Sequence, residues 1–467
     1  MPGRRSAGPS PVPPRHPRGR PAAPAAAVSA AAVSALCVAA VALAGCRAEA
    51  PGGPAVVTFP GSAVGAEAVV LRRQLERFME ARPDIRVISR PTPDAADQRH
   101  QLYVQWLNAG ASTPDILQLD VVWTPEFAAA GWILPLDRFA PDTAAFFPAT
   151  IAANRWDGTL FALPWFVDVG MLYWRTDLLD AAPRSFAEVE RAVARHVGAT
   201  APPDTAGGPV PRYGFVWQGA RYEGLVTVFQ EIAGGFGGRI LDERGRVAVD
   251  EEPAIRALTW MRDAVAGGAG PRVSPRTTLT WHEEEARFAF QNGQALLMRN
   301  WPYAVSLLAT DPDSRVRGHF AIAPMPAAPG GEPTAALGGS QLAINARTEH
   351  PEAAWAVLEY LTRPEQMLER AALVGQYPTR EVLYGEPELA EALGVDPAPV
   401  REIIARARPR PVSPVYTQLS EILQIRLHRA LTGQAEPADA LADAAREMRA
   451  FLRKVGLAPD GEGPDGG

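Results

Sequence analysis

Cysteine is nearly absent from this 467-residue chain: Cys37 and Cys46 are the only two, and both lie close to the N-terminus. The long remainder can therefore form no disulfide, hold no cysteine-based zinc site and use no thiol nucleophile. An excess of positive charge is also missing, because the formal net charge is -6. Nucleic-acid-binding domains usually carry a basic face, so we expect no nucleic-acid partner.

The motifs of common hydrolases are missing as well, since the sequence contains neither His-Glu-x-x-His nor Gly-x-Ser-x-Gly. His282 precedes three glutamates but has no second histidine nearby, which argues against a zinc site. The glycine-rich run 234–238 is not followed by Lys-Ser/Thr, so a flexible turn is a better interpretation than a phosphate loop. We expect a protein that is not an enzyme and that has no metal and no cofactor.

A long hydrophobic run occurs in one place only, over 22–44, and no later segment reaches membrane-spanning length. The run is rich in Ala and Val and follows a basic, proline-rich stretch, which is typical of a secretory signal. It ends in Leu-Ala-Gly-Cys46, which resembles a bacterial lipobox, where the cysteine becomes the first mature residue and is acylated. We predict a signal peptide over 1–45, a lipid anchor on Cys46 and a flexible tether over 46–54. An uncleaved signal anchor is the alternative.

The body of the chain has the composition of a globular protein, with 47% hydrophobic and 21% charged residues. From Ala55 on, short apolar runs alternate with amphipathic stretches, which favours parallel α/β units. The predicted strands cover 55–59, 84–88, 115–119, 170–174, 320–323 and 340–344. The predicted helices cover 67–82, 99–109, 186–196, 222–234, 252–267, 282–292, 351–362, 364–373, 417–432 and 436–455. We expect 459–467 to be a disordered tail.

Five segments in order resemble the extracellular solute-binding family that delivers oligosaccharides to ABC importers, and among its members the trehalose/maltose-binding lipoproteins. They are Pro114–Leu136, Asp157–Leu179, Gly293–Pro302, Leu337–Gly339 and His350–Trp355. The resemblance covers nearly all of the chain after Cys46. One block alone is a weak signal, whereas five in order behind a lipobox are a strong one.

The resemblance implies an α/β, two-lobed, periplasmic-binding-protein-like fold of class II topology, with hinge crossovers between the lobes and ligand in the cleft. By analogy, one lobe comprises 55–164 and 336–374, and the other comprises 165–335 and 375–458. The crossings are then expected at Pro164, just before Gly338 and at Gly375.

The resemblance also implies partners and a location. We expect a disaccharide or oligosaccharide ligand, either trehalose or maltose-like, and the transmembrane subunits of an ABC permease. We expect a monomer held by its lipid anchor at the extracytoplasmic face of the cell membrane. A sugar-sensing binding protein and an exported glycosidase with paired carboxylates are the alternatives.

Carboxylates are the first candidate sugar ligands, because they accept hydrogen bonds from adjacent hydroxyls. Asp120 ends an apolar strand and matches the family's sugar-binding Asp; the other interpretation is an N-cap for a helix starting near Thr124. Glu67 and Glu223 open predicted helices, where each could instead stabilise the first turn. Asp168 matches a position where the family has an acidic or amide ligand.

Aromatic platforms would hold the apolar face of a sugar. Trp301 resembles the family's stacking tryptophan, and Phe166 lies at the family's aromatic position two residues before Asp168. Core packing is the alternative for both, and for Trp165.

Two further candidates come from the backbone and from a cation. Gly339 would let the backbone approach a ligand closely. Ser340 follows it where some relatives have a tryptophan, which leaves the sugar open. Arg410 lies in a stretch similar to the family's ligand-binding "RP…P.Y" segment; Arg408 is the alternative match, and a surface ion pair the alternative role.

Overall fold

The computed structural model describes residues 53–61, 65–93, 96–197, 210–267, 272–393 and 396–459. The predicted signal peptide, Cys46 and nearly all of the tether lie outside the described residues, as does the tail from 460 on. The described residues from Pro54 on belong to one compact unit. Within the described ranges, no helix is long and apolar enough to cross a membrane.

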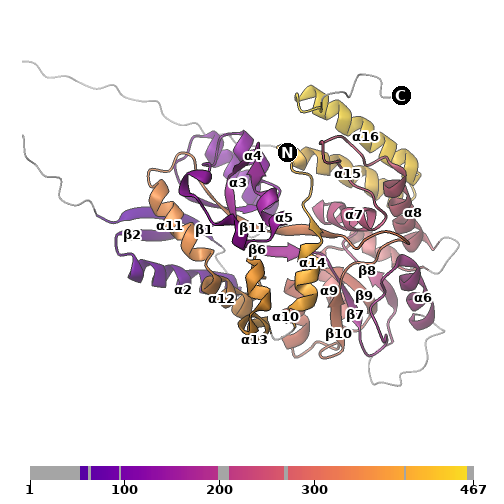
Figure 1. Ribbon diagram of the computed structural model, residues 1–467. Coiled ribbons are helices and arrows are strands. Elements are labelled where there is room, and N and C mark those ends of the chain that lie inside the picture. Colours follow the sequence, from indigo (N-terminus) through magenta and orange to yellow (C-terminus); the bar gives the residue numbers. More distant parts are fainter. Residues whose placement is uncertain are drawn as a thin grey trace, which may run out of the picture. The chain divides into compact units, whose positions relative to one another are not determined.

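The first described elements form a parallel βαβ unit. Strand β1 (Ala55–Gly61) pairs in parallel with β2 (Ile85–Pro91), and α2 (Gly65–Ala81) connects them. Leu71, Leu75 and Phe78 recur at helical spacing along α2 and are buried. This amphipathic spacing makes α2 pack against the sheet, and Figure 1 shows it beside β2.

A second sheet is built around the long strand β11 (Ala335–Ile344). Strand β3 (Ile116–Asp120) is antiparallel to its second half, and β6 (Ala162–Val169) is antiparallel to most of its length. Leu163 and Leu342 belong to the hydrophobic cluster that includes the first βαβ unit, whereas the other ends of β6 and β11 belong to a different cluster. Both strands therefore pass from one core into another.

A third segment lies beside these two strands. Gly375 (φ 67°) ends α12 (Pro364–Val374) in the left-handed conformation that glycine adopts readily. After it, the Tyr377 carbonyl accepts from the Val167 amide at 3.0 Å, and Thr379 donates to the Pro164 carbonyl at 3.0 Å. The three segments that the sequence analysis expected as crossings thus lie side by side; the lobe boundaries themselves stay a prediction.

The next sheet has the order β10-β7-β9-β8. Strands β7 (Met171–Arg175), β9 (Ala295–Asn300) and β10 (Phe320–Ala323) pair antiparallel, and β8 (Tyr213–Val216) is parallel to β9. Its helices include α7 (Glu223–Gly235), α8 (Glu252–Ala266), α15 (Tyr416–Leu431) and α16 (Pro437–Lys454). Residues 224–235 of α7 are all buried, because α8 and α15 pack against it (Figure 1).

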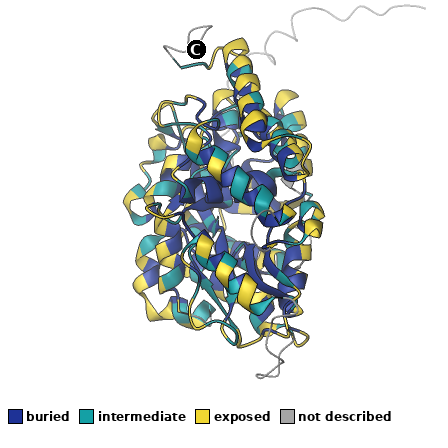
Figure 2. Cartoon of the chain, turned by 90° about the vertical axis from the view of Figure 1, so that its right-hand side faces the viewer, coloured by how far each residue is buried: buried dark blue, intermediate teal, exposed yellow. Residues whose placement is uncertain are grey.

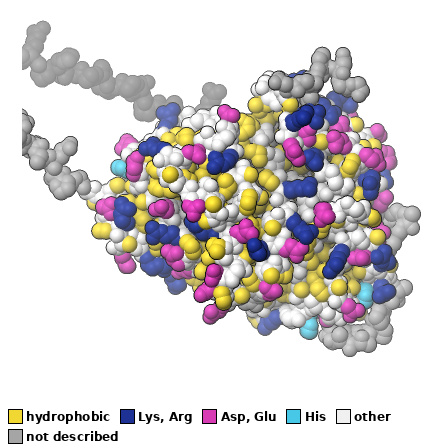
Figure 3. Space-filling view, in the orientation of Figure 1, with side chains coloured by type: hydrophobic (Ala, Val, Ile, Leu, Met, Phe, Trp, Pro, Cys, Tyr) yellow, Lys and Arg dark blue, Asp and Glu magenta, His cyan; other side chains and the backbone are white. Residues whose placement is uncertain are grey.

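The remaining elements complete the packing around these sheets. They are α3 (Ala96–Asn108), α4 (Thr124–Ala129), η1 (Asp137–Phe139), η2 (Thr143–Ala145), α5 (Pro148–Ala153), β4 (Arg155–Trp156), β5 (Thr159–Leu160), α6 (Phe186–His196), η3 (Arg276–Thr280), α9 (Glu283–Gln291), α10 (Tyr303–Thr310), α11 (Pro351–Leu361), η4 (Glu381–Gly385), α13 (Pro387–Leu393), α14 (Ala398–Ala405) and β12 (Ala407–Arg408). Figure 2 shows surface helices that are exposed on one side and buried on the other. On the face in Figure 3, basic and acidic side chains are interspersed.

The predicted strands and helices are confirmed to within a few residues, except that β11 begins five residues earlier than 340. The sequence analysis missed other strands and α-helices, namely β4, β5, β6, β8, β9, β12, α5, α10, α13 and α14. Most of these are short or lack a clear period, and β6 contains a proline.

Candidate ligand-binding cavity

A cavity of about 600 Å³ lies where β3, β6, β11 and the start of α7 meet. All eight predicted site residues line it: Glu67, Asp120, Phe166, Asp168, Glu223, Trp301, Gly339 and Arg410. An adjoining cavity of about 500 Å³ shares Glu67, Asp120, Phe166, Asp168, Tyr303 and Gly339 with it. Residues from widely separated parts of the sequence therefore converge on one hollow.

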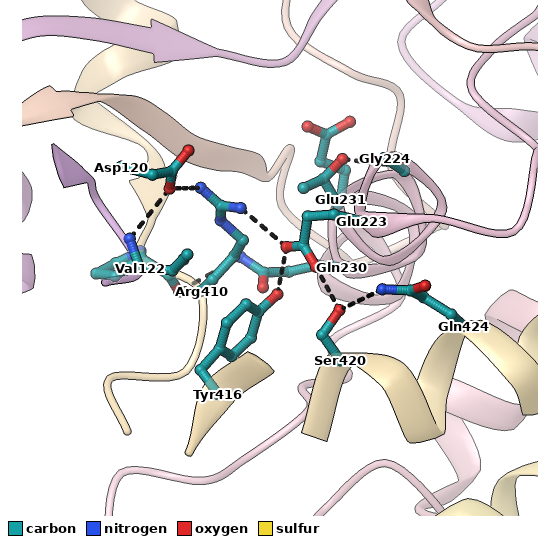
Figure 4. A network of polar contacts seen from close by, with 12 residues as sticks. Asp120, Val122, Glu223, Gly224, Gln230, Glu231, Arg410, Tyr416, Ser420 and Gln424 are labelled. Carbon is teal, nitrogen blue, oxygen red and sulfur yellow. Dashed lines mark hydrogen bonds and ion pairs between the residues drawn. The ribbon is translucent and has the colours of Figure 1, made fainter. Parts of the chain in front are cut away.

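Arg410 joins two of the carboxylates. Its Nη1 donates to Glu223 Oε1 at 2.8 Å and its Nη2 to Asp120 Oδ1 at 2.9 Å. Figure 4 shows the guanidinium between the two acids. Arg410 is only 6% exposed. Burial opposes its charge, but Asp120 and Glu223 outweigh this and raise the pKa of Arg410, so the cation is retained.

Glu223 is held from a second side by α15. Tyr416 donates its hydroxyl to Glu223 Oε1 at 2.6 Å, and Ser420 donates to Oε2. Gln424 in turn donates to the Ser420 hydroxyl at 3.0 Å (Figure 4). Glu223 lies in the first turn of α7, so it occupies the favourable end of the helix dipole and the cavity wall at once.

Asp120 ends β3 and makes two hydrogen bonds through one oxygen. Oδ1 accepts from the Val122 amide at 3.1 Å as well as from Arg410. Among the described residues, Oδ2 accepts none, which leaves it able to receive a ligand hydroxyl. The N-cap of α4 is Trp123, without a side-chain cap, so the interpretation of Asp120 as that cap is wrong.

Asp168 is a partly buried carboxyl on β6, where its backbone lies opposite Gly338. Burial, together with the negative charges of Glu67 and Asp120, raises its pKa to about 7, while Arg299 opposes the shift. At neutral pH the group is therefore divided between its acid and its carboxylate forms. It can donate a hydrogen bond to a ligand oxygen as well as accept one.

Glu67 is positioned by the segment that follows α12. Its Oε1 accepts from Gln376 Nε2 at 2.9 Å, and Gln376 Oε1 accepts from Arg370 Nε at 2.7 Å. The Arg370 guanidinium lies 3.9 Å from the centre of the Trp165 ring. Burial lowers the pKa of Arg370 to about 10, against the opposing effect of Glu67 and Glu369. Trp165 is itself buried, so core packing is its role, whereas Phe166 lines the cavity.

Trp301 is half-buried at the cavity wall and is fixed at three points. Its indole donates to Glu283 Oε1 at 3.2 Å, and its carbonyl accepts from the Tyr173 hydroxyl at 2.7 Å. The guanidinium of Arg299 lies 4.0 Å from its ring centre, and Arg299 forms a fully buried ion pair with Glu231. A ring held this firmly can act as a stacking platform.

The backbone conformation at position 339 requires a glycine. Its φ is 107°, and a Cβ atom there would lie 2.2 Å from the Phe166 carbonyl oxygen. Only glycine fits such a position without strain. Ser340 accepts from Gln118 Nε2 at 3.1 Å and lines the adjoining cavity.

Of the two candidate arginines, only Arg410 lines the main cavity; Arg408 is exposed and lines a separate one. Sequence reasoning missed Tyr222, Glu283, Tyr303 and Gln376 as lining residues. Tyr222 and Tyr303 lie within two residues of predicted site residues, which is a usable signal. No sequence signal of this kind points to Glu283 or Gln376. Within the described part of the chain, no group of three or more His, Cys, Asp or Glu is arranged to hold a metal.

Residues 65–368 match the family of bacterial extracellular solute-binding proteins. The chain belongs to this family. It is 34% identical to a probable ABC transporter-binding protein of Deinococcus radiodurans over 359 residues, which is 75% of this chain and 82% of that protein.

Solved structures of this family share the fold. Maltose-bound MalE3 of T. maritima matches with a TM-score of 0.73 and 39% identity, over 85% of this chain and 100% of that one. The sugar-binding protein MalE of Xanthomonas citri matches with a TM-score of 0.69 and 25% identity, over 86% and 98%. The predicted two-lobed α/β fold is therefore confirmed for this solute-binding protein.

Proposed function

We propose that this solute-binding protein captures a disaccharide, maltose-like or trehalose, for an ABC importer. The observation that carries the proposal is the convergence in one cavity of Trp301, Asp120, Asp168 and Arg410. An aromatic platform suits the apolar face of a sugar ring, and charged groups around it suit the hydroxyls. The maltose complex of T. maritima MalE3, at 39% identity, supports this ligand class.

Binding would be reversible and would involve no covalent chemistry. Asp120 Oδ2 would accept a hydrogen bond from a ligand hydroxyl, and Asp168 would accept or donate one, while Arg410 would hold Asp120 and Glu223 in place. The two lobes, proposed as 55–164 with 336–374 and 165–335 with 375–458, would close over the sugar by bending at the crossing segments.

The protein would then present the closed, loaded form to the transmembrane subunits of a permease. We place it as a monomer at the extracytoplasmic face of the cell membrane, anchored through acylated Cys46. Replacing Cys46 with serine should release the protein from the membrane fraction and remove the lipid mass from its N-terminus. Continued membrane association with an intact leader would instead identify an uncleaved signal anchor.

Isothermal titration calorimetry against maltose, trehalose, sucrose and longer glucans tests the ligand class. Saturable binding of at least one disaccharide, with the sugar recovered intact, is the expected result. Absence of binding to every sugar in the series would overturn the proposal. Cleavage of a sugar in the same mixture would favour the exported glycosidase instead.

A further inference from the structure

A separate cavity of about 520 Å³ lies against the second half of α7. Glu223 and Thr227 line the main cavity, which is the sugar cavity of the proposed function. Gln230 and Gly234, one and two turns further along α7, line the second cavity. These four positions recur at helical spacing and so share one face of the helix. Among the described residues, Arg410 alone lines both cavities. The segment 408–412 therefore divides the face of α7 into two sites.

Gln230, which lines this second cavity, carries an unsatisfied acceptor. Gln230 is 8% exposed, and its Nε2 donates to the carbonyls of Arg408 at 3.2 Å and Pro409 at 3.3 Å. These two bonds fix the orientation of the amide, because the reverse orientation would oppose oxygen to oxygen. Gln230 Oε1 is buried and has no hydrogen-bond partner among the described residues. A buried acceptor without a partner is costly, and a ligand hydroxyl or N–H group would satisfy it.

The rim offers positive charge. The Arg408 side chain is exposed and forms no ion pair among the described residues. Arg239 is paired only loosely, at 3.7 Å, with Glu243, whose side chain is 93% exposed. The carboxylate of Asp242 is occupied by the amide and the guanidinium of Arg246. Asp242 and Glu243 also line this cavity, but Asp242 is paired with Arg246 and the Glu243 side chain is 93% exposed. Arg408 is therefore the cation that can attract a carboxylate, with Arg239 beside it.

Much of the remaining lining is apolar. It comprises Ile240, Leu241, Pro409, Pro411 and Val412. Val412 is 41% exposed, so part of this apolar surface faces solvent. A ligand with a hydrocarbon framework between its donor and its anionic group would cover it.

We propose that this cavity is a second ligand site, for a small carboxylic acid that also carries a hydroxyl or amide donor, such as a sugar acid. The donor would bind Gln230 Oε1, and the carboxylate would lie at Arg408 and Arg239. The site is distinct from the sugar cavity and does not depend on which sugar that cavity takes.

The test uses D-glucuronate as the probe, measured by calorimetry with the full chain. Saturable binding is expected, and Arg408→Ala and Gln230→Met should each weaken it about tenfold, the loss expected for one hydrogen bond involving a charged or buried group. Val412→Trp should block the cavity and abolish binding. Arg406→Ala is the matched control, because Arg406 is exposed nearby but does not line this cavity.

Because glucuronate resembles a sugar, the two cavities must be told apart. Asp168→Ala alters the sugar cavity only, so it should leave glucuronate binding unchanged. No binding by the wild-type chain, or binding lost in Asp168→Ala but kept in Val412→Trp and Arg408→Ala, would overturn the proposal. Failure of maltose and trehalose to bind would count against the proposed function alone.

Discussion

Arg410 and Asp120 lie 290 residues apart in the sequence, yet Arg410 Nη2 donates to Asp120 Oδ1 at 2.9 Å. The same guanidinium reaches Glu223 at the start of α7. One buried cation thus ties the end of β3 to α7 and to the segment before α15. The two carboxylates, which both line the cavity, therefore share one buried positive charge.

Arg410→Ala should weaken sugar binding by about 1–3 kcal/mol, because the carboxylates lose the cation that orients them. Arg410→Lys should restore little, since a lysine cannot donate from two fixed nitrogens to two acids. Calorimetry measures the affinities. Arg408→Ala, at an exposed position outside the main cavity, is the control and should bind sugar normally. Equal sugar affinities in the wild type and the three variants would show that Arg410 does not contribute to sugar binding.

Asp168 should make stability depend on pH. Its pKa is about 7 in the folded protein, against 3.8 for an ordinary aspartate side chain, so between those values the folded state binds more protons than the unfolded state. The contribution of Asp168 to the free energy of unfolding should therefore fall as the pH rises from about 4 to about 7, and stay low above that. Asp168→Asn should remove this part of the slope and gain stability relative to wild type at pH 8.

Urea unfolding at pH 5, 6, 7 and 8 measures the difference between the wild type and Asp168→Asn. Glu421→Gln, at an exposed position on α15, removes a carboxyl without altering the cavity and should follow the wild-type curve. A constant difference between wild type and Asp168→Asn across this range would show that Asp168 ionises normally.

Trp301→Ala should reduce sugar affinity about tenfold through loss of the platform, whereas Trp301→Phe should keep most of it. Trp355→Phe is the control, because Trp355 stacks on Phe139 and does not line the cavity. Quenching of tryptophan fluorescence on sugar addition should also be smaller in Trp301→Phe than in Trp355→Phe. The same signal in both would place the platform elsewhere.

Gly339→Ala should destabilise the fold by about 1–3 kcal/mol or more, because its φ of 107° and the nearby Phe166 carbonyl exclude a Cβ atom. Gly385→Ala is the matched control, since no described residue has an atom within 4 Å of a Cβ atom built there. Thermal unfolding of both variants checks the contrast. A neutral Gly339→Ala would mean that β6 and β11 can separate without cost.

Local periodicity was sufficient to predict most of the elements. Helix α2 is an example, because the residues that recur every turn are the ones that pack inside. Strand β6 escaped prediction because Pro164 interrupts it; the structure tolerates this proline where the register of β11 shifts, between Ser340 and Gln341.

The candidate site could be predicted only through resemblance. No local pattern reveals that Asp120 faces Arg410, because that contact depends on how the sheets pack. The eight residues predicted from the resemblance all line one cavity, but the resemblance gave no reason to choose Glu283 or Gln376. In the structure, Glu283 accepts from the indole of Trp301, and Gln376 donates to the carboxylate of Glu67.

Phe166 and Asp168 lie on β6, Gly339 lies on β11 and Gln376 lies in the segment after α12, and all four line the main cavity. If the proposed lobes close, the backbone that bends is the backbone that carries these cavity residues. A sugar that forms a hydrogen bond with Asp168 would therefore act directly on a strand that bends. Sugar binding and lobe closure would then occur together, and a mutation that stiffens these strands should slow both.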